Sequence, residues 1–167
     1  MDGIVEEAQV NEPSYLRLAV RRETLRLHPT APLLLPREGQ STCHVEGYEI
    51  PAGTRIIVNA WAIARDPKYW SEPERFVPEQ FAAPGDADYK GTNFEYLPFG
   101  SGRRMCPGMV FGLASVSVAL AELLRRFDWR VPEGTTTAEE LDMEETGGAT
   151  AMRRVDLVLV ATTRDPK

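Results

Sequence analysis

Cysteine and histidine are both scarce in this sequence, with two of each among 167 residues. Cys43 and Cys106 are too few and too far apart for a disulfide framework, and no C-x-x-C or Cys/His spacing indicates a zinc site. We therefore expect a reducing compartment. A long hydrophobic run is also lacking. The stretch from Met109 to Leu124 contains two serines and a glutamate, so it is too short and too polar to span a bilayer, and we expect a buried helix there.

Basic residues are outnumbered, because 19 Lys and Arg oppose 25 Asp and Glu and leave a net charge of −6. No basic cluster stands out, so nucleic acid is not an expected partner. Six acidic residues between positions 133 and 145 indicate a solvated acidic loop. Residues 1–13 are acidic and lack an apolar core, so no secretory signal is predicted. A hydrophobic content of 43% is ordinary for a globular domain, and we expect one unit over residues 1–167.

Two helices are predicted. The first covers residues 14–27, with Ser14 as N-cap, and it ends before Pro29 because proline disfavours a helical conformation at the preceding residue. The second covers residues 108–124. The segment 29–37 holds three prolines and three leucines, which indicates an extended apolar strap.

Short extended segments complete the predicted architecture. We expect a β-hairpin over 43–59, in which strands 44–50 and 54–59 are joined by a turn at Pro51–Gly53. Residues 61–64 form one helical turn, and the aromatic-rich, Pro-broken meander 66–81 obtains its order from packing. A late strand is predicted at Val155–Ala161. The fold class is therefore mainly α with minor β.

Glu23 and Arg26 lie one turn apart on the first predicted helix. Apolar residues recur around Glu23 at spacings of four and three, which places this carboxylate in an apolar stripe where it needs a cationic partner. Arg26 supplies that partner. Arg75 lies in a stretch whose aromatics suggest burial, and its five donors make sharing of Glu23 a further possibility. The residues alone leave open a surface ion pair and a solvated Arg75.

The segment FGSGRRMCPG, residues 99–108, suits a cysteine that binds haem iron. A bound thiolate needs a positive, hydrogen-bond-donating pocket and a backbone that bends tightly around the sulfur. The glycines permit the bend, the two arginines supply positive charge, and Phe99 shields one side of the sulfur. The helix after Gly108 places Cys106 near its positive end. A small buried cysteine and a phosphate-binding loop are the alternatives, although no Gly-Lys-Ser/Thr is present.

These three pieces, in this order, resemble the cytochromes P450. The loop matches the family's haem-binding pattern F-x-x-G-x-R-x-C-x-G at every fixed position, namely Phe99, Gly102, Arg104, Cys106 and Gly108. Glu23 and Arg26 match its E-x-x-R motif, and Arg75 matches the arginine of P-x-R-F. Similarity to the plant A-type branch is found in four sequence segments, namely ETLRLHP, LLLPRE, AIARDPKYW and FVPEQF. The resemblance covers residues 15–160.

The resemblance implies the fold and the site. The chain would be the C-terminal, proximal haem-side part of the cytochrome P450 fold, with Cys106 as the ligand of haem b iron. Arg104 and Arg37 would pair with the haem propionates, and Glu23, Arg26 and Arg75 would form a network for folding and haem retention. Substrate-pocket candidates are in the strap and in the segment 146–152; they are Leu33, Leu34, Leu35, Ala149 and Thr150. From the residues alone, the leucines are equally explained as ordinary core.

The implied activity is a monooxygenase that inserts one oxygen atom into a small lipophilic metabolite, with electrons from NADPH through a cytochrome P450 reductase. Whole members of this branch lie on the cytosolic face of the endoplasmic reticulum through an N-terminal anchor. No counterpart of that anchor or of the family's long distal helix is found before Asn11, so we expect this chain alone to be cytoplasmic, truncated and inactive. A non-catalytic haem-binding fragment and a cofactor-free interaction module are the alternatives.

Overall fold

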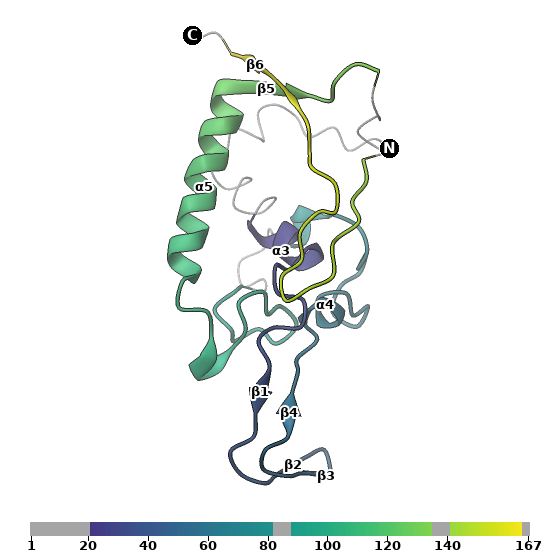
Figure 1. Cartoon of the computed structure of the whole chain (residues 1–167), viewed down its shortest axis with the longest axis vertical. Coiled ribbons are helices and arrows are strands. Elements are labelled where there is room, and N and C mark those ends of the chain that lie inside the picture. Colours follow the sequence, from purple (N-terminus) through teal and green to yellow (C-terminus); the bar gives the residue numbers. More distant parts are fainter. Residues whose placement is uncertain (1–20, 82–87, 135–140, 165–167) are drawn as a thin grey trace.

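The structure is a computed structural model that describes residues 21–81, 88–134 and 141–164. One long helix, α5 (Met109–Arg126), stands along one side, and the remaining elements are short (Figure 1). The other helical elements are α3 (Thr24–Leu27), α4 (Ala60–Ile63) and the 3-10 turns η2 (Pro78–Phe81) and η3 (Gly102–Arg104). Much of the described chain is irregular, so the predicted mainly helical class holds in part.

Helix α3 ends where the proline rule predicts. The backbone N–H of His28 still donates to the carbonyl of Thr24 at 2.7 Å, and the chain then leaves the helix at Pro29. The predicted start at Ser14 lies outside the described residues. Only the last turns of the predicted helix are therefore described, and they carry Glu23 and Arg26.

The strap after α3 is bent, which corrects the expectation of an extended segment. The N–H of Leu34 donates to the carbonyl of Ala31 at 3.0 Å, and Leu34 has a positive φ of 51°. Pro32 occupies the second position of this turn, where a fixed proline φ is favourable. Leu33 and Leu35 are exposed and Leu34 is half-buried, so the leucines are not ordinary core.

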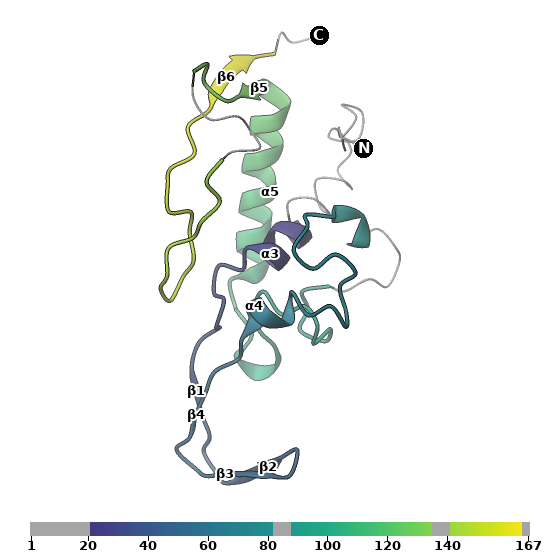
Figure 2. The ribbon, with the colours of Figure 1, turned by 90° about the vertical axis from the view of Figure 1, so that its right-hand side faces the viewer.

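The predicted hairpin over 43–59 has a different register. Its tightest turn lies at Glu46 and Gly47, both with positive φ, as two-residue hairpin turns require. That turn joins β2 (Cys43–Val45) to β3 (Tyr48–Ile50), and a second antiparallel pair joins β1 (Arg37–Glu38) to β4 (Arg55–Ile56). The turn at Pro51–Gly53 connects the two pairs instead of forming the hairpin. The four strands build an arm that projects from the molecule (Figures 1 and 2).

The late strand also differs from the prediction. Strand β5 (Phe127–Arg130) follows α5 directly and pairs antiparallel with β6 (Val160–Thr163). Among the described residues, strand β5 pairs only with residues 160–163. Residues 155–159 of the predicted strand are not paired with β5 and lie outside β6. Strand β5 was not predicted, because four residues after a long helix give too short a pattern.

The described core is small and aromatic. Trp70, Phe81 and Tyr96 contact one another with ring centroids 5.2 to 6.2 Å apart, and they hold the meander 66–81 in place. The Tyr96 hydroxyl donates to the carbonyl of Arg22 at 2.8 Å. Burial raises the pKa of Tyr96 far above its ordinary value, so the phenol keeps its proton for this bond.

Helix α5 is much less buried than predicted. Leu113 is its one buried residue, while apolar side chains such as Val110 and Phe111 are exposed. Arg21 ties the helix to the segment before α3, because its Nε donates to the Ser117 hydroxyl at 2.7 Å. Within the described ranges, no helix has the length and apolar character needed to cross a membrane.

Candidate functional site: a buried ion pair behind an exposed cysteine loop

Glu23 and Arg26 form a fully buried ion pair, and both side chains are 0% exposed. The contact is bidentate: Arg26 Nε donates to Glu23 Oε2 and Nη2 donates to Oε1, each at 2.8 Å. Parallel bonds of this kind combine charge with fixed geometry. The surface ion pair that the residues alone left open is not what the structure has.

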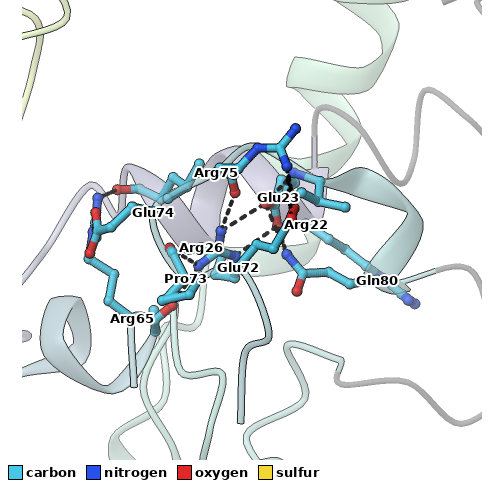
Figure 3. Close-up of polar contacts among 12 residues, drawn as sticks. Arg22, Glu23, Arg26, Arg65, Glu72, Pro73, Glu74, Arg75 and Gln80 are labelled. Carbon is cyan, nitrogen blue, oxygen red and sulfur yellow. Dashed lines mark hydrogen bonds and ion pairs between the residues drawn. The ribbon is translucent and has the colours of Figure 1, made fainter. Parts of the chain in front are cut away.

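The remaining donors of Arg26 bind three carbonyls from distant parts of the chain (Figure 3). Nη1 donates to the carbonyls of Ala64 at 2.8 Å and Pro73 at 2.7 Å, and Nη2 donates to the carbonyl of Arg75 at 2.8 Å. All five N–H groups of the guanidinium thus have partners. One side chain joins α3 to the end of α4 and to the meander.

Glu23 is equally well satisfied. Its Oε1 accepts the backbone N–H of Val77 at 2.8 Å, and the side-chain amide of Gln80 donates to both oxygens at 3.1 and 3.2 Å. Burying a carboxylate costs several kcal/mol of lost hydration, and partners such as these offset that cost. Gln80 and Val77 were not singled out by the sequence, because only the folded meander brings them to Glu23.

Arg75 does not share Glu23, which corrects the proposed three-residue network. Its guanidinium is 74% exposed and pairs with Glu72 at 2.8 Å (Figure 3). The Arg75 carbonyl takes one of the Arg26 donors, while the Arg75 side chain pairs with Glu72 at the surface. Arg75 therefore contributes its carbonyl to the network, and its side chain is a solvated loop charge.

The side chain of Arg65 is more buried than that of Arg75, and its role was not predicted from the sequence. Its side chain is 10% exposed, donates to the carbonyl of Leu27 at 2.5 Å and pairs with Glu74 at 3.2 Å. It also lies over the Trp61 ring, 4.3 Å from the centroid. The sequence feature that could have indicated a buried arginine is its position directly after the short apolar turn 60–64. Arg65 thus covers the C-terminal end of α3.

These two arginines give a direct test of the network. Arg75→Ala is expected to lower the free energy of unfolding by less than about 1 kcal/mol, because an exposed ion pair contributes little. Arg65→Ala is expected to cost about 1.5 to 3 kcal/mol, since it removes a charged hydrogen bond to a carbonyl at a helix end. Urea unfolding of both variants measures the difference. An Arg75→Ala loss as large as that of Arg65→Ala would contradict the described positions.

The loop 99–108 bends tightly around Cys106. The N–H of Cys106 donates to the carbonyl of Phe99 at 3.0 Å, and two glycines in the loop, Gly100 and Gly102, have positive φ. Cys106 has a free, exposed thiol, three residues before the start of α5. A β-carbon on Gly108 would lie 4.0 Å from its sulfur. The sulfur is therefore accessible, close to the positive end of an 18-residue helix.

Gly91 packs directly against this loop. This contact was not predicted. Its φ is 81°, and a β-carbon there would approach the Gly100 carbonyl oxygen, the Met105 sulfur and the Ser101 Cα, each to 3.1 Å. The Ser101 hydroxyl donates to the Gly91 carbonyl at 2.6 Å. Such close backbone contact is possible only with glycine. The turn around Gly91 fixes the first half of the cysteine loop.

Of the two arginines expected near haem propionates, Arg104 lies within the loop and Arg37 contacts it from β1. Arg37, on β1, reaches the Ser101 carbonyl at 3.4 Å, and Arg104 is exposed in η3. Among the described residues, neither guanidinium has a carboxylate partner. Phe99 is half-buried against the edge of Tyr89, with centroids 6.0 Å apart. One accessible thiol and two guanidinium groups fit a haem with two propionates.

The substrate-pocket candidates come from segments that the structure brings together. The Ala151 N–H donates to the Thr30 carbonyl at 2.8 Å, which joins the segment 146–152 to the strap. Ala149 and Thr150 are exposed beside this contact. Leu34 lies close to the cysteine loop, because its Cδ1 would be 3.7 Å from a β-carbon on Gly100. The strap therefore connects both regions.

Comparison with known proteins places the chain in a family. The family model for cytochrome P450 matches residues 3–155, and the chain belongs to this family. It is 56% identical over 158 residues to desmethyl-deoxy-podophyllotoxin synthase of Sinopodophyllum hexandrum, and 52% identical over 159 residues to tabersonine 16-hydroxylase 2 of Catharanthus roseus. Each alignment covers 95% of this chain and 31% of the relative. The chain thus spans about a third of the length of these relatives.

A solved structure shares the fold. A zebrafish cytochrome P450, in a structure with abiraterone, superposes with a TM-score of 0.78 at 30% identity, over 90% of this chain and 34% of that one. The short helices and small sheets described above are therefore part of a cytochrome P450 fold.

Proposed function

We propose that this chain provides the proximal, thiolate side of the haem site of a monooxygenase that inserts one oxygen atom into a small lipophilic metabolite. The observation that carries the proposal is the accessible Cys106 sulfur in a glycine-bent loop at the start of α5. A bound haem supplies the activation of molecular oxygen. Electrons would come from NADPH through a cytochrome P450 reductase at the cytosolic face of the endoplasmic reticulum.

The residues of the chain would hold the haem in three ways. Cys106 would bind the iron through its thiolate, and Arg37 and Arg104 would bind the propionates as hydrogen-bonded ion pairs. Phe99 would shield the sulfur, and Gly102 and Gly108, which have no side chains, would leave space for the haem beside the loop. The buried Glu23–Arg26 pair would act indirectly, because it holds α3 and the meander together.

The metabolite class is supported by the relatives and by the strap. The relatives include a tabersonine 16-hydroxylase and, at 51% identity, a premnaspirodiene oxygenase of Hyoscyamus muticus. Leu33 and Leu35 offer exposed apolar surface next to the cysteine loop, which suits a lipophilic ligand. We propose a plant secondary metabolite as substrate.

For residues 1–167 alone, a non-catalytic haem-binding role is the second candidate. The observation in its favour is exposure: in the described part of the chain, Cys106 and most of α5 are open to solvent. A haem bound there would exchange ligands with water and lose reducing equivalents.

Haem titration followed by turnover with a plant reductase tests both candidates. We expect saturable haem binding to residues 1–167 without NADPH-dependent oxygenation of a premnaspirodiene probe. Oxygenation by this polypeptide would establish the enzyme and reject the non-catalytic candidate. Absence of saturable binding would reject both and leave a cofactor-free interaction module.

A further inference from the structure

The segment that follows the acidic stretch forms a small hairpin, residues 144–154, with internal backbone hydrogen bonds. The Thr146 N–H donates to the Met152 carbonyl at 2.8 Å, and the Arg154 N–H donates to the Glu144 carbonyl at 2.7 Å. Glu145 and Arg153 face each other as an antiparallel pair. The tip of this 144–154 hairpin holds Ala149 and Thr150, both exposed.

Two contacts attach the 144–154 hairpin to the segment that follows α3. One is the backbone bond from the Ala151 N–H to the Thr30 carbonyl at 2.8 Å. The other joins His28 Nδ1 to Glu145 Oε1 at 2.6 Å, across 117 positions of sequence. Arg154 also pairs with Asp142, directly before the hairpin. Among the described residues, the His28–Glu145 contact is the one hydrogen bond or ion pair between side chains that links the hairpin to the chain outside residues 141–154.

His28 is well placed to hold the hairpin because its own position is fixed. It follows the last turn of α3, and its backbone N–H binds the Thr24 carbonyl at 2.7 Å. The buried Glu23–Arg26 pair anchors the same helix. The ring and the Glu145 side chain are 34% and 26% exposed, so solvent only partly screens their contact.

We propose that His28 and Glu145 are positioning residues that fix the tip of the 144–154 hairpin against the strap and thereby set the shape of one wall of the substrate pocket. The inference rests on the proposed function, because only in a monooxygenase would the strap and the tip of the hairpin form walls of a substrate pocket. The two residues act through Ala149 and Thr150 and have no part in the oxygenation chemistry.

Amide hydrogen exchange on the full 167-residue chain tests the positioning. In His28→Ala, the Ala151 amide is expected to exchange about tenfold to a hundredfold faster, because a charge-assisted contact across the junction is lost. The Thr146 and Arg154 amides, which are bonded within the hairpin, are expected to keep their protection. Equal acceleration of all three amides, or an unchanged Ala151, would overturn the proposal.

Three further variants make this result specific. Glu145→Ala is expected to reproduce the effect from the other partner, and combining it with His28→Ala should add little. His28→Asn, which can place an amide N–H near the position of Nδ1, is expected to restore part of the protection. His44→Ala is the matched control, since the second histidine pairs with Glu49 on the projecting arm. Acceleration at Ala151 in His44→Ala would overturn the proposal.

Two haem-binding probes connect the positioning to the pocket. On the haem-loaded chain, His28→Ala is expected to weaken the binding of 4-phenylimidazole about tenfold relative to imidazole, because the added phenyl group would contact the proposed pocket wall. If both probes bind the parent chain normally and His28→Ala binds each of them with the same affinity as the parent chain, the positioning role alone is overturned. If the parent chain binds neither probe, the proposed function fails and the pocket role fails with it.

Discussion

Arg26→Leu is expected to destabilise the chain by about 3 to 5 kcal/mol, a large part of the roughly 5 to 15 kcal/mol by which an ordinary domain is stable. The substitution leaves the Glu23 carboxylate buried without its cation. It also removes the donors bound by the Ala64, Pro73 and Arg75 carbonyls. Urea unfolding followed by the fluorescence of Trp70, which lies against the Arg26 guanidinium, measures the loss directly.

Arg125→Leu is the matched control. Glu122 and Arg125 repeat the same residue types at the same spacing of three, but on the exposed surface of α5. The loss there is expected to stay below about 1 kcal/mol. Losses of similar size in the two variants would show that burial of the Glu23–Arg26 pair does not determine its contribution.

Cys106→Ser is expected to weaken haem binding by at least about tenfold, the lower end of what the loss of an outer partner of a metal ligand usually costs. A hydroxyl at this position cannot replace a thiolate as an iron ligand at neutral pH. Haem titration followed through the Soret band gives both affinities.

Cys43→Ser is the control for the cysteine variant. Cys43 is also free and exposed, but it lies on β2 in the projecting arm. Its replacement is expected to leave the haem affinity unchanged. Equal losses in the two variants would mean that haem binds the thiols without a defined site.

The sequence predicted those parts of the site whose cause is local. Glu23 falls in an apolar stripe, and the spacing to Arg26 made their pairing a matter of helix geometry. The bend of the loop around Cys106 was also predicted, because its glycines permit positive φ values. The role of Cys106 as a thiolate ligand stays a prediction. The pair and the bend both rest on residues within a few positions of one another.

Parts that depend on distant segments were not predictable. The Arg75 carbonyl, and not its guanidinium, contacts the buried pair, and the local sequence pattern does not encode this. The hairpin turn at Glu46 and Gly47 was not predicted, because glutamate rarely adopts a positive φ. The His28–Glu145 contact spans 117 positions, so only the folded chain reveals it.

Exposure was the other source of error. A run of apolar residues predicts the length of α5 well, but it does not tell which partner covers the helix. The described residues bury only Leu113 of this helix. The apolar pattern was therefore correct as a helix signal and wrong as a signal of burial within the described chain.

The reduced, carbon-monoxide-bound absorption spectrum of the haem-loaded chain tests the central claim, that Cys106 binds haem iron as a thiolate. The account predicts the red-shifted Soret band of a thiolate-ligated carbonyl complex, retained in Cys43→Ser and lost in Cys106→Ser. A Soret band typical of histidine ligation in the parent chain, unchanged by Cys106→Ser, would contradict it.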